Sequence, residues 1–337
     1  MNYSNGARAL GLTCISWLVA CSEGPAVSGS AGTAPGGAGQ GSVLAGSGGG
    51  GSSAAGASSA GDAAGGMAAG GVSGSAGSGG ASGETAGGQA GMAPIDPNAP
   101  EPSMGCGSAE PLAEGEIELQ VGDLMRSYVV RKPENYDAAR PWPLLLALHP
   151  NGSGSSYWDA TSGERAFRPL LAEEAILVLP QGRENDWRGD VPLDLEYFDA
   201  LLAQVQAGLC VDKKRIFAMG FSGGGSFSGA LGCYRTDIRA IAAGGAVIYF
   251  EEPDCVGSPA AWITIGDLES IQGRLDYRDF FRTDAGCENT SQGVPPEMCI
   301  AYDCPDPKRP VHFCSHPGDH VWPSFGTSAT WDFFTQF

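Results

Sequence analysis

Basic residues are scarce in this sequence. Of its 337 residues, 19 are Lys or Arg and 38 are Asp or Glu, which gives a formal net charge of −19 at pH 7. Residues 106–337 hold 33 of the acidic and 18 of the basic side chains. Proteins that bind nucleic acid or an anionic membrane surface normally present an excess of basic side chains. The composition therefore argues against both as direct partners.

The N-terminus lacks an apolar segment long enough to span a bilayer. The stretch from Ala9 to Ala20 follows a single basic residue, Arg8, and is shorter than the roughly 20 residues that a transmembrane helix needs. This layout is typical of a secretory signal, and a small residue before Cys21 resembles a bacterial lipobox. We therefore predict a signal peptide over 1–21 and a lipid on Cys21, as in a cell-surface or outer-membrane lipoprotein. The lipid anchor is then the one expected membrane contact, and an ordinary signal peptide cut nearby is the alternative.

Aromatic side chains are missing from residues 22–105. This segment contains no Phe, Trp or Tyr and holds 27 of the 53 glycines, with mostly Ala and Ser between them. Such a composition cannot bury enough apolar surface to offset the conformational entropy lost on folding. It predicts a disordered tether with a root-mean-square span of roughly 50 Å, followed by one folded domain over 106–337.

The spacings of a metal site are also absent. No C-x-x-C pair occurs and the four histidines do not fall at zinc spacing relative to the cysteines, so neither a metal nor another cofactor is expected.

Of the ten cysteines, Cys14 falls in the signal peptide and Cys21 is predicted to carry lipid. The remaining eight suggest four disulfides in an exported domain, with the pairing left open. The last four of them are expected to pair among themselves. The eight are Cys106, Cys210, Cys233, Cys255, Cys287, Cys299, Cys304 and Cys314.

Short apolar runs alternate with helical patterns along 106–337. Strands are expected where continuous apolar residues end in Pro or Gly, and helices where apolar residues recur at helical spacing. Asp194 is expected to cap one of these helices. The expected strands lie within 126–137, 141–150, 176–182, 215–220, 240–247, 260–266 and 309–315, and the helices within 167–175, 195–208, 223–233 and 328–337. This alternation predicts an α/β fold, with a mostly parallel, doubly wound sheet and helices on both faces.

The stretch Gly220-Phe221-Ser222-Gly223-Gly224 follows an expected strand and opens an expected helix. G-x-S-x-G in this setting is typical of a nucleophile elbow, because small flanking residues let the chain make a sharp turn that lifts the serine Oγ above the sheet. We therefore predict that Ser222 is a catalytic nucleophile. Such a serine needs a base that takes its proton and a carboxylate that orients the base.

The other parts of a serine hydrolase are present in the order that this fold requires. Residues 148–154 end an early strand, where backbone N–H groups can face a developing oxyanion. Residues 263–270 end a late strand and offer Asp267 and Glu269 as the acid. His320, in a loop before the last expected helix, is the predicted base.

Several stretches resemble the secreted esterases that include bacterial poly(3-hydroxybutyrate) depolymerases and feruloyl or acetylxylan esterases. The matching stretches are RSYVV, PLLLALHPNGSG, LPQG with Trp187 after it, CVDKKRIFAMGFSGGG, Gly286-Cys287, and PVHFCSHPGDHVWPSF with WDFF behind it. The resemblance covers nearly all of 106–337. It implies an α/β-hydrolase fold with Ser222 and His320 in the nucleophile and base positions.

The oxyanion loop departs from the family pattern. The family usually has His-Gly where this chain has His149-Pro150. Proline has no N–H to donate, so the donor must lie beyond it. The backbone N–H groups of Asn151 and Gly223 are the expected oxyanion donors.

The acid position departs as well. The family motif is roughly H-G-T-x-D, and laid over 265–269 it places Glu269, a longer carboxylate, at the acid. Either carboxylate serves in α/β-hydrolases, and Asp267 is the alternative.

The predicted function is that of an extracellular serine esterase and monomer that hydrolyses soluble or short feruloyl or acetyl esters of plant-wall polysaccharide fragments. Depolymerisation of poly(3-hydroxybutyrate) or hydroxyalkanoate oligomers is the alternative, and a non-catalytic binding protein on a hydrolase fold is the rival from another class. Loop aromatics on the catalytic side are expected to line the substrate site, or else only to pack the loops. They are Tyr157, Trp158, Trp187 and Trp322.

Overall fold

A computed structural model describes Asp96, residues 99–269 and residues 272–337. These residues fall within one compact unit, Ala86–Phe337. The predicted signal peptide, Cys21 and nearly all of the predicted tether lie outside the described residues. Within the described part of the chain, none of the helices combines the length and the apolar character needed to cross a membrane.

A ten-stranded sheet forms the centre of the domain. Its spatial order is β1-β2-β4-β3-β5-β6-β7-β10-β9-β8. The six strands from β4 to β10 in this order are parallel, and antiparallel strands extend the sheet at both edges. The strands are β1 (Gly115–Val121), β2 (Leu124–Arg131), β3 (Trp142–Leu148), β4 (Ile176–Pro180), β5 (Val211–Phe221), β6 (Ala240–Gly244), β7 (Ala260–Gly266), β8 (Ser291–Val294), β9 (Cys299–Tyr302) and β10 (Val311–His316).

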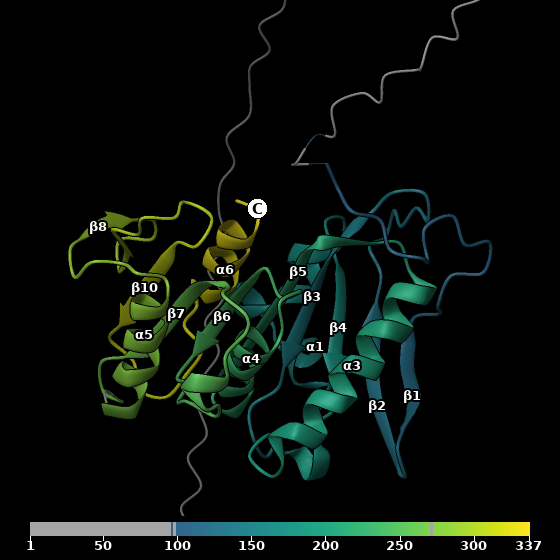
Figure 1. Ribbon diagram of the computed structural model, residues 1–337, viewed down its shortest axis with the longest axis horizontal. Coiled ribbons are helices and arrows are strands. Elements are labelled where there is room, and N and C mark those ends of the chain that lie inside the picture. Colours follow the sequence, from purple (N-terminus) through teal and green to yellow (C-terminus); the bar gives the residue numbers. More distant parts are fainter. Residues whose placement is uncertain (1–95, 97–98, 270–271) are drawn as a thin grey trace, which may run out of the picture. The chain divides into compact units, whose positions relative to one another are not determined.

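Helices cover both faces of this sheet (Figure 1). Side chains of α3, α4 and α5 pack in one core cluster, and those of α1, α2 and α6 pack in a second. In β3, Leu144 and Leu146 enter the first cluster and Leu145 enters the second, because successive side chains of a strand point to opposite faces. The α-helices are α1 (Tyr157–Ala160), α2 (Phe167–Leu171), α3 (Val191–Gly208), α4 (Gly223–Tyr234), α5 (Gln272–Asp284) and α6 (Gly326–Phe334). The predicted α/β-hydrolase architecture is confirmed.

The start of α3 corrects one expectation from the sequence. Asp190, not Asp194, is the N-cap, and its side chain accepts a hydrogen bond from the Leu193 N–H. Asp194 lies one turn inside the helix and is fully buried, where its Oδ1 is 2.9 Å from a nitrogen of Arg126. An acidic residue near a helix start is read equally well as a cap or as a buried ion-pair partner from sequence alone.

Four disulfides link the eight cysteines of the domain, and the expected pairing of the last four among themselves is confirmed. The bonds join Cys106–Cys210, Cys233–Cys255, Cys287–Cys304 and Cys299–Cys314. Such a set is typical of oxidising compartments and fits an extracellular protein.

Contacts with the domain begin before Cys106. Pro102 forms a β-bridge with Asp212, and Ser103 Oγ donates to the Leu209 carbonyl oxygen at 2.7 Å. The last residues of the segment that composition assigns to the tether are therefore held against the domain.

Candidate active site

The turn between β5 and α4 carries Ser222. Its backbone has φ +55° and ψ −123°, a combination that is strained for a residue with a side chain. Glycine is required on both sides of it: a Cβ on Gly220 would lie 2.3 Å from the Gly224 carbonyl carbon, and a Cβ on Gly224 would lie 2.3 Å from the Leu148 oxygen. The sharp strand-to-helix turn predicted from G-x-S-x-G is present.

Three loops at the carboxyl ends of β5, β7 and β10 bring the predicted triad residues together. His320 Nε2 lies 2.9 Å from Ser222 Oγ. His320 Nδ1 is hydrogen-bonded to Oε2 of Glu269, whose Oε1 accepts the Gly266 N–H at 2.9 Å. The order of contacts is therefore hydroxyl, imidazole, carboxylate, as proton transfer from the serine requires.

Asp267, the alternative acid, has a different environment. Its side chain is exposed and accepts a hydrogen bond from Ser315 Oγ, while its N–H donates to the His316 carbonyl oxygen at 2.7 Å. Of the two carboxylates, the one that contacts His320 is Glu269.

Arg274 of α5 is part of this site, and no sequence pattern predicted its place there. Its Nη1 lies 3.3 Å from Glu269 Oε2, and the Glu269 side chain is only 5% exposed. Burial alone would raise the pKa of Glu269, but hydrogen bonds from His320 and the Gly266 N–H, together with the Arg274 charge, hold the pKa below its ordinary value. The carboxylate is thus ionised at neutral pH. The one available signal was a basic residue five positions after the acid.

The imidazole of His320 is enclosed by two further residues. A Cβ on Gly245, where φ is +57°, would lie 2.6 Å from His320 Cε1 and 2.8 Å from Arg274 Nη1. The Phe221 ring packs with its centroid 4.6 Å from that of the imidazole. These contacts restrict the orientation of the ring.

Asn151 and Gly223, which carry the expected oxyanion donors, are in direct proximity. The Asn151 Oδ1 accepts the Trp187 N–H at 3.1 Å. A Cβ on Gly223 would lie 2.0 Å from this same oxygen. The β3–α1 loop therefore rests against the first turn of α4.

Three of the four loop aromatics do not line a substrate site, which corrects the expectation for Trp158, Trp187 and Trp322. Trp158 and Trp187 are fully buried and Trp322 is 3% exposed. Their indole N–H groups donate to the Leu148 oxygen, the His149 oxygen and Thr327 Oγ1, respectively. Each ring packs inside the protein, and its indole N–H is satisfied there by an internal acceptor. Tyr157 is half-buried.

His149 belongs to the same support. The Gly182 N–H donates to its Nε2 at 3.0 Å, and the ring is fully buried.

Among the described residues, no group of three or more His, Cys, Asp or Glu side chains is arranged to hold a metal ion.

Several known proteins with similar sequences are named feruloyl esterases. The chain is 31% identical to feruloyl esterase D of Neurospora crassa over 273 residues. The aligned region covers 71% of this chain and 92% of that protein. It is 31% identical over 255 residues to a probable feruloyl esterase C of Aspergillus oryzae, with 69% and 90% covered. Comparison with models of protein families gives no match.

Solved structures show the same fold at low sequence identity. A ferulic acid esterase from Anaeromyces mucronatus superimposes with a TM-score of 0.50 and 16% identity, covering 68% of this chain and 91% of that one. An acetyl xylan esterase from Aspergillus awamori superimposes with a TM-score of 0.51 and 11% identity, covering 66% and 99%. The chain therefore belongs to the feruloyl esterase family and is a serine carboxylic ester hydrolase with an α/β-hydrolase fold.

Proposed function

We propose that Ser222, His320 and Glu269 form the catalytic triad of this esterase. The observation that carries the proposal is the continuous hydrogen-bonded chain from Ser222 Oγ through the imidazole to Glu269. The strained backbone of Ser222 supports it, because strain of this kind persists where function requires a side chain to be presented.

The reaction follows from the roles of these groups. Ser222 Oγ attacks the ester carbonyl carbon while His320 Nε2 takes the hydroxyl proton, and Glu269 stabilises the imidazolium that forms. The N–H groups of Gly223 and Asn151 donate to the oxyanion of the tetrahedral intermediate. The imidazolium then gives its proton to the leaving alcohol oxygen. Water repeats the sequence on the acyl-enzyme and releases the acid and the free serine.

The substrates that we propose are feruloyl or acetyl esters of plant-wall polysaccharide fragments. The two similar proteins described above are both named feruloyl esterases, and a solved structure of the same fold is an acetyl xylan esterase. These names favour aryl and acetyl sugar esters over hydroxyalkanoate oligomers.

A fluorophosphonate reagent tests the function and the nucleophile together. We expect it to attach to the peptide that contains Ser222 and to abolish methyl ferulate hydrolysis in proportion to labelling. Hydrolysis of methyl ferulate and acetylated xylan fragments should exceed that of hydroxybutyrate oligomers. Full activity in a fully labelled protein would reject the nucleophile, and faster hydrolysis of the oligomers would move the substrate to polyesters.

We also propose that the esterase works at the cell surface, held by a lipid on Cys21 through the tether predicted over 22–105, whose last residues contact the domain. The disulfides of the domain and the sequence pattern before Cys21 support this location. Cys21→Ser is expected to move the protein from the detergent phase to the aqueous phase with its esterase activity intact. A wild-type protein that is already found in the aqueous phase would rule out the anchor.

A further inference from the structure

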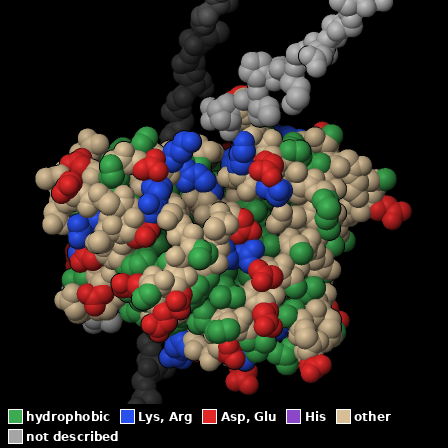
Figure 2. Space-filling view, viewed as in Figure 1, with side chains coloured by type: hydrophobic (Ala, Val, Ile, Leu, Met, Phe, Trp, Pro, Cys, Tyr) green, Lys and Arg blue, Asp and Glu red, His purple; other side chains and the backbone are tan. Residues whose placement is uncertain are grey.

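Positive charge gathers in one groove of this acidic protein. The chain has four lysines in all, and three of them, Lys213, Lys214 and Lys308, line a groove of about 990 Å³ together with Arg215 and Arg239. Figure 2 shows several basic side chains close together near the upper edge of the view. With only four lysines in a chain of net charge −19, three in one groove is an uneven distribution.

The groove is separate from the active site. Its residues Lys213–Arg215 lie near the start of β5, and Ser222 follows the last residue of the same strand. At about 3.3 Å per residue, this strand puts roughly 30 Å between the start of β5 and the nucleophile. The two features are thus at opposite ends of the strands of the sheet.

Two of the five cations have no carboxylate partner. Among the described residues, no carboxylate oxygen lies within 4 Å of the side-chain nitrogens of Lys308 or Arg239. Lys308 is exposed, and the Arg239 guanidinium lies 3.8 Å from the centroid of the half-buried Phe337 ring, which also lines the groove. The exposed Lys308 is therefore available to an external anion, whereas the half-buried Arg239 also interacts with the charge of Asp306.

The other cations are held in place by neighbouring groups. Lys213 Nζ lies 2.5 Å from Glu101, and Lys214 Nζ donates to the Ala99 carbonyl oxygen at 2.8 Å. Arg215 pairs with Asp212 at 2.6 Å. The groove therefore has a fixed outline, with acidic Asp212 and Asp237 at its wall.

We infer that this groove binds a strand of acidic polysaccharide through its uronate carboxylates. A concave groove fits a single polymer strand better than it fits a flat bilayer. A strand that lies in the groove contacts the cations, and the Phe337 ring, one face of which is covered by Arg239, adds an apolar surface beside them. Binding here would leave the distant active site open to substrate.

Binding of polygalacturonate to the purified chain tests this inference, with no need for esterase activity. The wild type is expected to be retarded in gels that contain the polymer, and to be released as salt rises from about 0.02 M to 0.15 M. Lys308→Glu removes one attraction and adds a repulsion, so its Kd should rise roughly tenfold. Hydrolysis of methyl ferulate by Lys308→Glu should equal that of the wild type, since the groove lies far from Ser222.

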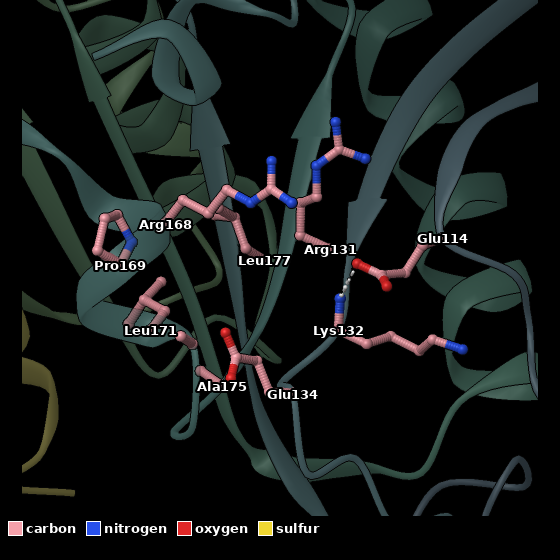
Figure 3. A pocket seen from close by; sticks show the side chains of 10 residues that line it. Glu114, Arg131, Lys132, Glu134, Arg168, Pro169, Leu171, Ala175 and Leu177 are labelled. Carbon is pink, nitrogen blue, oxygen red and sulfur yellow. Dashed lines mark hydrogen bonds between the residues drawn. The ribbon is translucent and has the colours of Figure 1, made fainter. Parts of the chain in front are cut away.

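Lys132 supplies the matched control, because it is the one lysine outside the groove. It lines a different cavity of about 370 Å³ with Arg131 and Arg168, and its backbone N–H donates to Glu114 (Figure 3). Lys132→Glu carries the same change of charge and should change the Kd by less than about twofold.

Three results would overturn the inference. The first is a wild type that polygalacturonate does not retard at low salt. The second is equal weakening by Lys132→Glu and Lys308→Glu, which would indicate an effect of net charge alone. The third is Lys308-dependent binding to phosphatidylglycerol vesicles without binding to polygalacturonate, which would assign the groove to the membrane surface.

Discussion

Replacement of Glu269 by glutamine is expected to lower kcat for a soluble aryl ester by about four powers of ten, the loss seen when the orienting acid of a serine triad becomes an amide. The two oxygens of Glu269 face three donors, from His320, Arg274 and the Gly266 N–H. An amide keeps only one acceptor. If its NH₂ group faces His320 Nδ1, the ring must carry its proton on Nε2, where it cannot accept the proton of Ser222.

Asp267→Asn is the matched control for this change. It removes the same charge two residues away, from an exposed side chain bonded to Ser315. We expect kcat to fall by less than about threefold, because a change at an exposed group is largely screened by solvent. Thermal melting of both variants should confirm that they fold. The opposite ranking of the two variants would assign the orienting role to Asp267.

The strands that could be predicted from the sequence are those buried on both faces. β3, β4, β6 and β7 are buried along their whole length, so they read as continuous apolar runs. β1, β8 and β9 escaped prediction. β1 and β8 lie at the two edges of the sheet, where side chains are largely exposed and polar, and β9 has only four residues. Local composition carries little information about such strands.

The α5 helix was missed for a related reason. Only Tyr277 and Phe281 of its side chains are buried, and the rest of the helix is strongly polar. The position of Arg274 against Glu269 depends on how this helix packs beside β7 and β10, which no local pattern specifies. The contribution of Arg274 to the acid therefore became visible only with the structure.

Unlike α5 and the edge strands, the nucleophile and the base could be predicted from the sequence, since their motifs describe local geometry. G-x-S-x-G specifies a turn that small residues alone permit, and the order serine, acid, histidine follows from the order of the parallel strands. The roles of the three tryptophans could not be predicted in this way. A tryptophan in a loop has the same sequence signature whether its ring faces substrate or packs beneath the loop, as Trp158, Trp187 and Trp322 do.

Gly223→Ala is expected to lower kcat by about 10²–10³-fold, the loss that follows removal of one oxyanion donor. The new Cβ would lie 2.0 Å from Asn151 Oδ1 and 2.2 Å from its Cγ. Asn151 has a short side chain, and the Trp187 N–H and Tyr249 hydroxyl group hold its end. The clash must therefore move the β3–α1 loop, and with it the Asn151 N–H that we propose as an oxyanion donor. KM for methyl ferulate should change much less than kcat, because the interaction is made mainly in the transition state.

A double variant separates the steric cause from a general defect in folding. In Gly223→Ala with Asn151→Ala, the side chain that meets the new Cβ is gone while both backbone N–H groups remain, so kcat should recover to the level of Asn151→Ala alone. Gly293→Ala in β8 is the control for the added methyl group, since a Cβ there meets nothing within 4 Å. It should leave kcat unchanged. A double variant as slow as Gly223→Ala would mean that the added Cβ acts on Ser222 itself, and the Asn151 N–H would then lose its place as an oxyanion donor.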